Sequence, residues 1–354
     1  MAHTLAAASE SKTEIASAQP GAPSLASRWK ARLGVRTIGA LYVWAIIIVI
    51  FGIWAPDTFL TADTARTILN QNAVTGLVAL GLVVPLSAGV FDLSIGATIA
   101  LSGIVTAWML GHTEMGPYQA AVIGIGAGLL VGVLNSIVVV GMKVDSFIAT
   151  LATGSIVSAI TIAISGRQLL LTGGQGPFSD IAQKTMFTVT RPVIYMLVVM
   201  LILGIIMQKT VRGRQIYATG FDADTAKLAG IPTLSLRAAS LVVSAGIAGF
   251  AGIVLASRLG AGSPTEGPTY LLPAFAAAFL GATQFQPGRF NAWGTIVAVL
   301  MIGTGQTGIV LVGAPAWASD VFLGVVLILA VSITGLEQRR SLRRRRRSAE
   351  ATEE

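Results

Sequence analysis

The stretch that decides the fold, residues 76–110, reads GLVALGLVVPLSAGVFDLSIGATIALSGIVTAWML. Two apolar runs, each close to the length of a bilayer crossing, flank a short break at residues 87–94. Asp92, inside this break, is the only formally charged residue of the stretch. A carboxylate at or near the hydrocarbon region costs a few kcal/mol, so Asp92 is a candidate site residue. The pattern predicts two spanning helices with a polar break between them.

Two roles are open for Asp92. As the N-cap of a helix that starts at Leu93, its side chain would accept backbone N–H groups near the positive end of the helix dipole. The same break could instead line a transport path, as broken helices do in many transporters. Asp92 and the nearby Ser94 are therefore candidates for a substrate pathway as well as for a helix cap.

The composition of the whole chain is that of a polytopic membrane protein. Hydrophobic residues make up 54% of the 354 residues and charged residues 11%, against about 25% charged in soluble domains. The 40 glycines fit closely packed membrane helices. We therefore predict an all-α protein of about ten transmembrane helices, the eighth of them the weakest because it is short and carries Pro273. The predicted spans are 37–54, 65–87, 92–110, 117–141, 145–165, 192–208, 235–257, 270–286, 291–312 and 317–336.

Lysine and arginine are distributed unevenly between the two sides that these spans define. With the N-terminus inside, only five of the 24 Lys and Arg residues fall in outer segments: Arg66, Arg167, Lys184, Arg191 and Arg258. The other nineteen are cytoplasmic, and this bias predicts that both termini are cytoplasmic. We expect residues 1–33 to be a disordered tail, 34–337 the transmembrane domain and 338–354 a basic tail.

Seven arginines lie within residues 339–347, directly after the last predicted span. Such runs bind nucleic acid in some proteins. Next to a span they more often anchor the helix and contact anionic lipid. We therefore expect the lipid bilayer, and no nucleic acid, to be the partner of this tail.

The longest inner loop, residues 209–234, joins the sixth and seventh predicted spans. Asp222 or Asp224 can cap a short helix over residues 223–229, and Gly230 with Pro232 can end it. These residues alone are consistent with two roles for the loop: an ordinary solvated connector or an element that docks on a partner.

The sequence lacks the residues that several kinds of binding site and catalysis require. The chain has no cysteine and only two histidines, His3 and His112, so it offers no thiolate or imidazole metal site. It contains no G-x-x-x-x-G-K-[ST] loop for nucleotide phosphates. The scarcity of charge inside the predicted spans disfavours an ion-coupled secondary carrier. A membrane enzyme is disfavoured because no nucleophile–base pair is evident.

Three motifs resemble those of the permease subunits of ribose-type ABC sugar importers. Residues 87–96 resemble G-G-[IF]-D-L-S-[VI]-G, although Val90 stands where the family usually has its second glycine. Residues 213–231 resemble G-R-x-[IY]-Y-A-x-G-x-[ND]-x-x-A-A-x-x-[SA]-G-I, and residues 280–295 resemble L-G-[GA]-x-x-x-x-x-G-R-x-[NS]-x-x-G-T. The motifs follow the same order as in the family and fall on consistent sides of the membrane.

The resemblance implies an ABC-importer permease fold in the inner membrane of a bacterium. It implies three protein partners: an ATPase subunit, a periplasmic-type or lipoprotein sugar-binding protein, and a second permease copy, either identical or a close paralogue. ATP and magnesium would be bound by the ATPase, and no cofactor by this chain. Residues 209–234 would carry the coupling helix that docks in a groove of the ATPase, with Ala226 and Gly230 on its small-residue surface. The residues implied in this coupling loop are Arg214, Asp222, Asp224, Ala226, Lys227, Leu228, Gly230 and Ile231.

The implied solute is a ribose- or xylose-like monosaccharide or a polyol, which presents hydroxyl groups rather than charge. Other solutes of related permeases stay open: an autoinducer furanose, a nucleoside or a branched-chain amino acid. Neutral polar side chains would line the path, although each could equally serve helix–helix hydrogen bonding. Besides Asp92, the candidates are Asn70, Gln71, Asn72, Ser94, Gln306 and Thr307.

A faint internal repeat relates the two ends of the central region. Gly89-Val-Phe-Asp92 is echoed by Gly288-Arg-Phe-Asn291, and each precedes an apolar run. Chance similarity between glycine-rich segments is the alternative. In the second copy we expect Asn291 to cap the ninth span.

Overall fold

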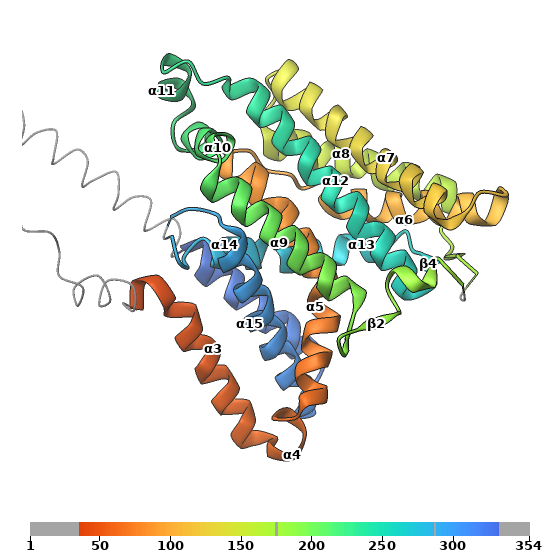
Figure 1. Cartoon of the computed structure of the whole chain (residues 1–354), viewed down its shortest axis with the longest axis vertical. Helices are drawn as coiled ribbons and strands as arrows, with labels where there is room; N and C mark the ends of the chain where they lie inside the picture. Colours follow the sequence, from red (N-terminus) through yellow and green to blue (C-terminus); the bar gives the residue numbers. More distant parts are fainter. Residues whose placement is uncertain (1–34, 174–175, 287, 333–354) are drawn as a thin grey trace, which may run out of the picture.

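The computed structural model describes residues 35–173, 176–286 and 288–332 of the chain (Figure 1). The predicted tails, 1–33 and 338–354, lie outside these residues. The described part is a bundle of long helices with a few two-residue strands. Its long helices are α3 (Val35–Trp54), α5 (Ala62–Ser87), α6 (Ile95–His112), α7 (Pro117–Ser136), α8 (Ser146–Ser165), α9 (Arg191–Lys209), α12 (Thr233–Leu259), α15 (Ala292–Leu311) and a helix over Trp317–Ser332.

Shorter elements join these helices. At one end of the bundle are α10, α11 and the π-helical turn η1; at the other are α4, the 3₁₀ turn η2 and four strands. The short helix α13 lies beside the start of α6, and α14 is a short apolar helix. Their bounds are α4 (Pro56–Phe59), η1 (Ile137–Gly141), β1 (Leu170–Leu171), η2 (Ser179–Ile181), β2 (Thr185–Met186), β3 (Val189–Thr190), α10 (Val211–Phe221), α11 (Ala223–Leu228), β4 (Ala261–Gly262), α13 (Glu266–Thr269) and α14 (Leu271–Gly281).

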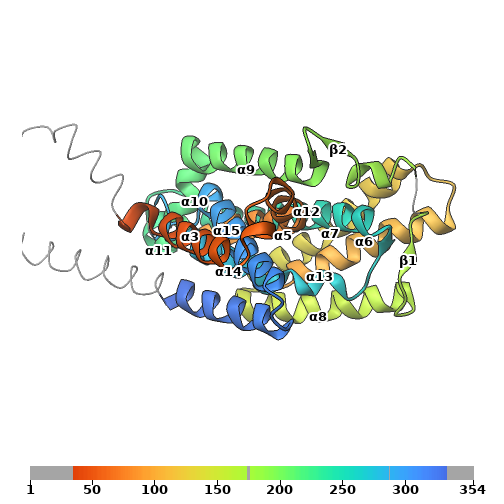
Figure 2. The ribbon, with the colours of Figure 1, turned by 90° about the horizontal axis from the view of Figure 1, so that it is seen from below.

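Helix α5 forms the centre of the bundle. It packs against α12, α15, α14 and α9, and its apolar side chains on every face are buried, among them Leu77, Leu80 and Leu82. A helix that is apolar all round is stable only where neighbours cover it. Figure 2 shows α9 on one side of the bundle and α8 on the opposite side, together with the helix Trp317–Ser332.

Helix α7 approaches α6 and α12 through a stripe of glycines, Gly124, Gly128 and Gly132. A methyl group built on Gly132 would lie 2.8 Å from the Cα of Val242, and one on Gly128 would lie 3.0 Å from the Cα of Gly249. Membrane helices associate through such close backbone contact because burial from lipid supplies little hydrophobic driving force. The high glycine content of the sequence therefore serves packing here.

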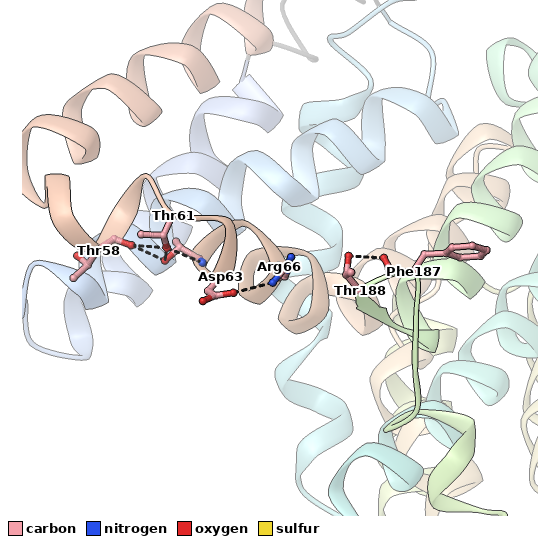
Figure 3. Close-up of polar contacts among 7 residues, drawn as sticks. Thr58, Thr61, Asp63, Arg66, Phe187 and Thr188 are labelled. Atoms are coloured by element: carbon pink, nitrogen blue, oxygen red, sulfur yellow. Dashed lines mark hydrogen bonds and ion pairs between the residues drawn. The ribbon is translucent and has the colours of Figure 1, made fainter.

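Short-range hydrogen bonds and an ion pair hold the chain at the strand-bearing end of the bundle (Figure 3). The Thr61 side chain accepts the Thr64 N–H at 3.1 Å and so caps α5, while Arg66 pairs with Asp63 at 3.0 Å one turn into the helix. Strands β2 and β3 pair antiparallel around a turn at Phe187 and Thr188, and β1 pairs with β4. The β1–β4 pair joins loops that come from distant parts of the sequence, whereas β2 and β3 form a local hairpin.

The number of ten spans is not confirmed. Seven described helices are long and apolar enough to cross a membrane, and Leu41–Trp54 and Trp317–Ser332 are shorter apolar stretches. The predicted span 270–286 is wrong as drawn, because its helical part is α14, whose 11 residues are only about 16 Å long. The helix ends at Gly281, where the backbone meets Gly294 and Thr295 of α15 so closely that a Cβ would overlap them.

Candidate functional site

The first break, residues 88–94, separates α5 from α6. Helix α5 ends at Ser87, Gly89 takes the left-handed conformation with φ 74°, and α6 begins at Ile95. Gly89 is needed because a side chain in this conformation is strained and a Cβ would lie 3.2 Å from Gly220 of α10. The chain therefore changes direction in a few residues, with backbone groups that need partners from other helices.

Asp92 lies in this break and is completely buried. One carboxylate oxygen accepts the Ser94 hydroxyl at 2.7 Å and the Ser94 N–H at 3.2 Å. The other accepts the Ser244 hydroxyl of α12 at 2.8 Å. Asn135 of α7 in turn donates to the Ser94 hydroxyl at 2.7 Å. The carboxylate thus joins the break to α12 directly and to α7 through Ser94.

The expected capping role of Asp92 is wrong in its detail. The helix begins at Ile95 rather than Leu93, and its N-cap position is Ser94, whose own side chain makes no capping bond. Asp92 does accept a backbone N–H before the first turn, as expected, but it also accepts the hydroxyls of Ser94, in the break itself, and of Ser244 on α12. The bond from Ser244 arises from tertiary packing, which brings α12 against the break.

Helix α8 holds the backbone of the first break from another side. The Ser146 hydroxyl accepts the Phe91 N–H at 3.1 Å, and the Thr150 hydroxyl accepts the Leu93 N–H at 3.0 Å. Free backbone N–H groups are costly when buried, so these bonds fix the break as a defined turn.

A second break, residues 282–291, joins α14 to α15. Asn291 is completely buried and caps α15, as expected, by accepting the Gly294 N–H at 2.7 Å. Its amide also donates to the carbonyls of Gly281 and Gln284 at 3.1 and 3.0 Å. Gly288 is left-handed with φ 82°, like Gly89 in the first break. The two segments that echo each other in sequence thus share a left-handed glycine, but Asn291 is the N-cap of α15 whereas Asp92 is not the N-cap of α6.

Helices α10 and α11 form the segment predicted to couple to an ATPase. Asp222 caps α11 through the N–H groups of Asp224 and Thr225, at 3.1 and 3.0 Å. The bonds from Thr225 hold the pKa of the Asp222 carboxyl below its usual value, so it is charged at neutral pH. Gly230 ends the helix in a left-handed conformation with φ 79°. The predicted cap and stop signals are confirmed.

The exposed surface of α11 differs from the predicted docking surface at one residue, Ala226. Ala226 is only 5% exposed, so it packs within this chain and cannot present a small-residue surface to a partner. Leu228 is 91% exposed, the opposite of what its apolar side chain favours. Asp224, Lys227 and Gly230 are exposed beside it. Of the other coupling-loop residues, Arg214 is exposed on α10 and Ile231 is half-buried against the core.

Asn70 and Gln71 lie far from Asp92. Between Asn70 and Ser87, α5 runs for 17 residues, or about 25 Å. The Asn70 side chain accepts the backbone N–H and the hydroxyl of Thr190, each at 3.0 Å. Both residues line a pocket of about 340 Å³ at the strand-bearing end, and its other lining residues are Ala182, Gln183, Thr190 and Arg258.

The remaining pathway candidates lie near Asn70 and far from Asp92. Asn72 bonds the Ile68 carbonyl at 2.8 Å and packs against Gly303 of α15. Gln306 and Thr307 are half-buried on α15, about one turn beyond Gly303. The candidates therefore fall in two places: Asp92 and Ser94 lie at the first break, and the other five lie on α5 and α15 toward the strand-bearing end.

Known proteins resemble most of this chain. The profile of the family described as "Branched-chain amino acid transport system / permease component" matches residues 64–331. The chain belongs to this permease family. The D-allose transport system permease AlsC of Escherichia coli K12 is 32% identical over 84% of this chain and 91% of its own length. The ribose import permease RbsC of Bacillus subtilis is 32% identical over 81% and 88%, and the fructose import permease FrcC of Rhizobium meliloti 30% identical over 83% of each.

A solved chain described as an inward-facing ABC transporter of the metal-chelate type covers 84% of the permease and 97% of that chain. Its identity is 13% and its TM-score 0.41, so the likeness is too distant to define this fold. Membership of the family makes the chain a multi-pass transporter subunit rather than an enzyme. In an ABC importer, such a subunit works with ATPase and substrate-binding partners.

Sequence reasoning missed four residues of the permease that hold the first break: Asn135, Ser146, Thr150 and Ser244. Asn135 had a usable signal, since an amide within an apolar run needs a buried partner. The serines and threonine had none, because such residues commonly bond their own helix and are frequent in membrane spans. Among the described residues, no group of three His, Asp or Glu side chains could hold a metal.

Proposed function

We propose that this permease imports a neutral monosaccharide or polyol across a bacterial inner membrane, driven by a partner ATPase. A binding protein outside the membrane delivers the solute, and two permease copies, identical or closely related, form the path. The observation that carries the proposal is the similarity to permeases for allose, ribose and fructose over more than four fifths of the chain.

The polar groups inside the bundle agree with a neutral cargo. The buried carboxylate of Asp92 already has three hydrogen-bond donors from its own chain, so it does not offer an unpartnered charge to an ion. Amides and hydroxyls such as those of Asn72, Gln306 and Thr307 match the hydroxyl groups of a sugar. We keep them as candidate pathway residues, with Asn70 and Gln71 at the entry.

The test is uptake by the complete importer in proteoliposomes. The permease, its ATPase and its binding protein are reconstituted with ATP inside, and accumulation of labelled ribose, allose, fructose, a nucleoside and leucine is compared. We expect one monosaccharide or polyol to accumulate at least tenfold above the nucleoside and leucine. Preferred accumulation of leucine or the nucleoside would contradict the proposal.

The orientation follows from the charge bias, with both termini and α11 on the cytoplasmic side. Because the chain has no cysteine, single cysteines report on sidedness directly. Leu228 is 91% exposed on α11 and Leu171 is 76% exposed on β1, and these two elements lie at opposite ends of the bundle (Figure 2). In spheroplasts that express the permease alone, we expect a membrane-impermeant maleimide to label Leu171→Cys at once and Leu228→Cys only after permeabilisation. The reverse order of labelling would contradict the orientation.

A further inference from the structure

One carbonyl oxygen, that of Phe290 in the second break, lies where three segments meet. It accepts the Tyr217 hydroxyl of α10 at 2.6 Å and the Ser87 hydroxyl, from the last residue of α5, at 3.4 Å. Phe290 directly precedes Asn291, the cap of α15. A single acceptor thus connects α10 with the end of α5 and the start of α15.

The Tyr217 ring is held in place from the same segment. The Arg289 guanidinium lies 5.5 Å from the ring centroid, in the range of a cation–π contact. Burial raises the pKa of Tyr217, so its hydroxyl keeps its proton and stays a donor. The Phe290 ring in turn stacks edge-on against Phe279 of α14, with centroids 5.3 Å apart.

The contact of α10 with the first break is steric. A methyl group built on Gly220 would overlap the Ser87 carbonyl oxygen, so the two backbones touch without an intervening side chain. Arg237, the fifth residue of α12, donates to the Ala88 carbonyl at 3.4 Å. Helix α11 is therefore flanked in sequence, at Gly220 and at Arg237, by contacts to residues 87–89.

These contacts distinguish the two breaks. A shift of α10 and α11 would push on the first break through the backbone contact at Gly220. A side-chain substitution in α10 does not remove this backbone contact. The second break is joined to α10 by the Tyr217 hydroxyl and the Arg289 contact. Removing the Tyr217 hydroxyl therefore weakens the link between α10 and the second break, while the first break stays in contact with α10.

We infer that the hydrogen bond from the Tyr217 hydroxyl to the Phe290 carbonyl transmits movement of the α10–α11 segment to the second break. Tyr217 is then a positioning residue that sets how much solute moves for each ATP hydrolysed. This inference rests on the proposed function, because it requires that α11 receives the motion of an ATPase. It goes beyond that function by naming the contact through which the motion reaches α15.

The experiment uses Tyr217→Phe in the reconstituted importer, since phenylalanine keeps the ring and its Arg289 contact. Sugar uptake and ATP hydrolysis stimulated by the loaded binding protein are measured on the same vesicles. We expect uptake to fall about three- to tenfold, the range that one lost hydrogen bond supports, while ATP hydrolysis stays within twofold. Tyr195→Phe, a change of the same kind on α9, is the control and should leave the ratio of uptake to hydrolysis unchanged.

Three results would overturn the inference. The first is an unchanged ratio for Tyr217→Phe; the second is an equal fall of uptake and hydrolysis. The third is failure of the variant to bind the ATPase, because a hydroxyl at the second break should not affect docking at α11. A wild-type complex that moves no monosaccharide would instead overturn the proposed function, and this inference with it.

Discussion

Replacement of Asp92 by leucine is expected to abolish folded permease, whereas asparagine is expected to preserve it. Leucine leaves the Ser94 N–H and the hydroxyls of Ser94 and Ser244 without their acceptor in a fully buried site. Each lost partner costs about 1–3 kcal/mol, so the free energy of unfolding should fall by about 3 kcal/mol or more. Asparagine can accept from Ser94 and donate to the Ser244 hydroxyl, which also accepts hydrogen bonds.

The measurement is monodispersity after detergent extraction, paired with sugar uptake by each variant. Asp145→Leu is the control, because Asp145 caps α8 through the N–H groups of Phe147 and Ile148 but is exposed. Its loss should cost only about 1 kcal/mol and leave the protein monodisperse. An Asp92→Asn variant that is well folded yet transports nothing would show that the charge serves transport, and would contradict the structural role.

The Leu228→Asp variant is expected to lose its ATPase partner while the permease still reaches the membrane. Leu228 is 91% exposed at the tip of α11, so the change costs the isolated chain little. Burial of a leucine in a partner's groove contributes about 1.5–3 kcal/mol, which corresponds to at least a tenfold loss of affinity. Co-purification of the ATPase with tagged permease measures the effect.

The matched control for docking is Leu171→Asp, the same substitution at the opposite end of the bundle. It should retain the ATPase, since Leu171 is 76% exposed on β1, which lies far from α11 (Figure 2). Ala226→Arg tests docking poorly, because Ala226 is buried and the variant should misfold. Normal co-purification with Leu228→Asp would argue that the ATPase docks elsewhere.

Local signals in the sequence were sufficient for much of the fold. The caps at Asp222 and Asn291 and the helix stop at Gly230 depend on backbone groups within four residues, and all three are confirmed. The apolar runs likewise located most of the long helices. The span at 270–286 failed because α14 ends at Gly281, where it meets the backbone of α15, and an apolar run carries no information about that contact.

The candidate site was less predictable because its parts are assembled by packing. Asp92 was recognisable as a lone charge, but its partner Ser244 lies 152 residues away on α12. Ala226 looked suitable for docking by its size, yet the way α11 packs turns it inward and leaves Leu228 outward. The hydroxyl of Tyr217 donates to a backbone carbonyl 73 residues away. Every residue has a backbone carbonyl, so the sequence does not indicate which one accepts this bond.

The central claim is that solute accumulation depends on ATP hydrolysed by a partner subunit. The most direct measurement compares accumulation of the preferred sugar in proteoliposomes that contain the permease with and without its ATPase, with ATP inside and the binding protein outside. The account predicts accumulation only where the ATPase is present, and its loss when ATP is replaced by a non-hydrolysable analogue. Equal accumulation in vesicles without the ATPase, driven by a proton or sodium gradient, would contradict it.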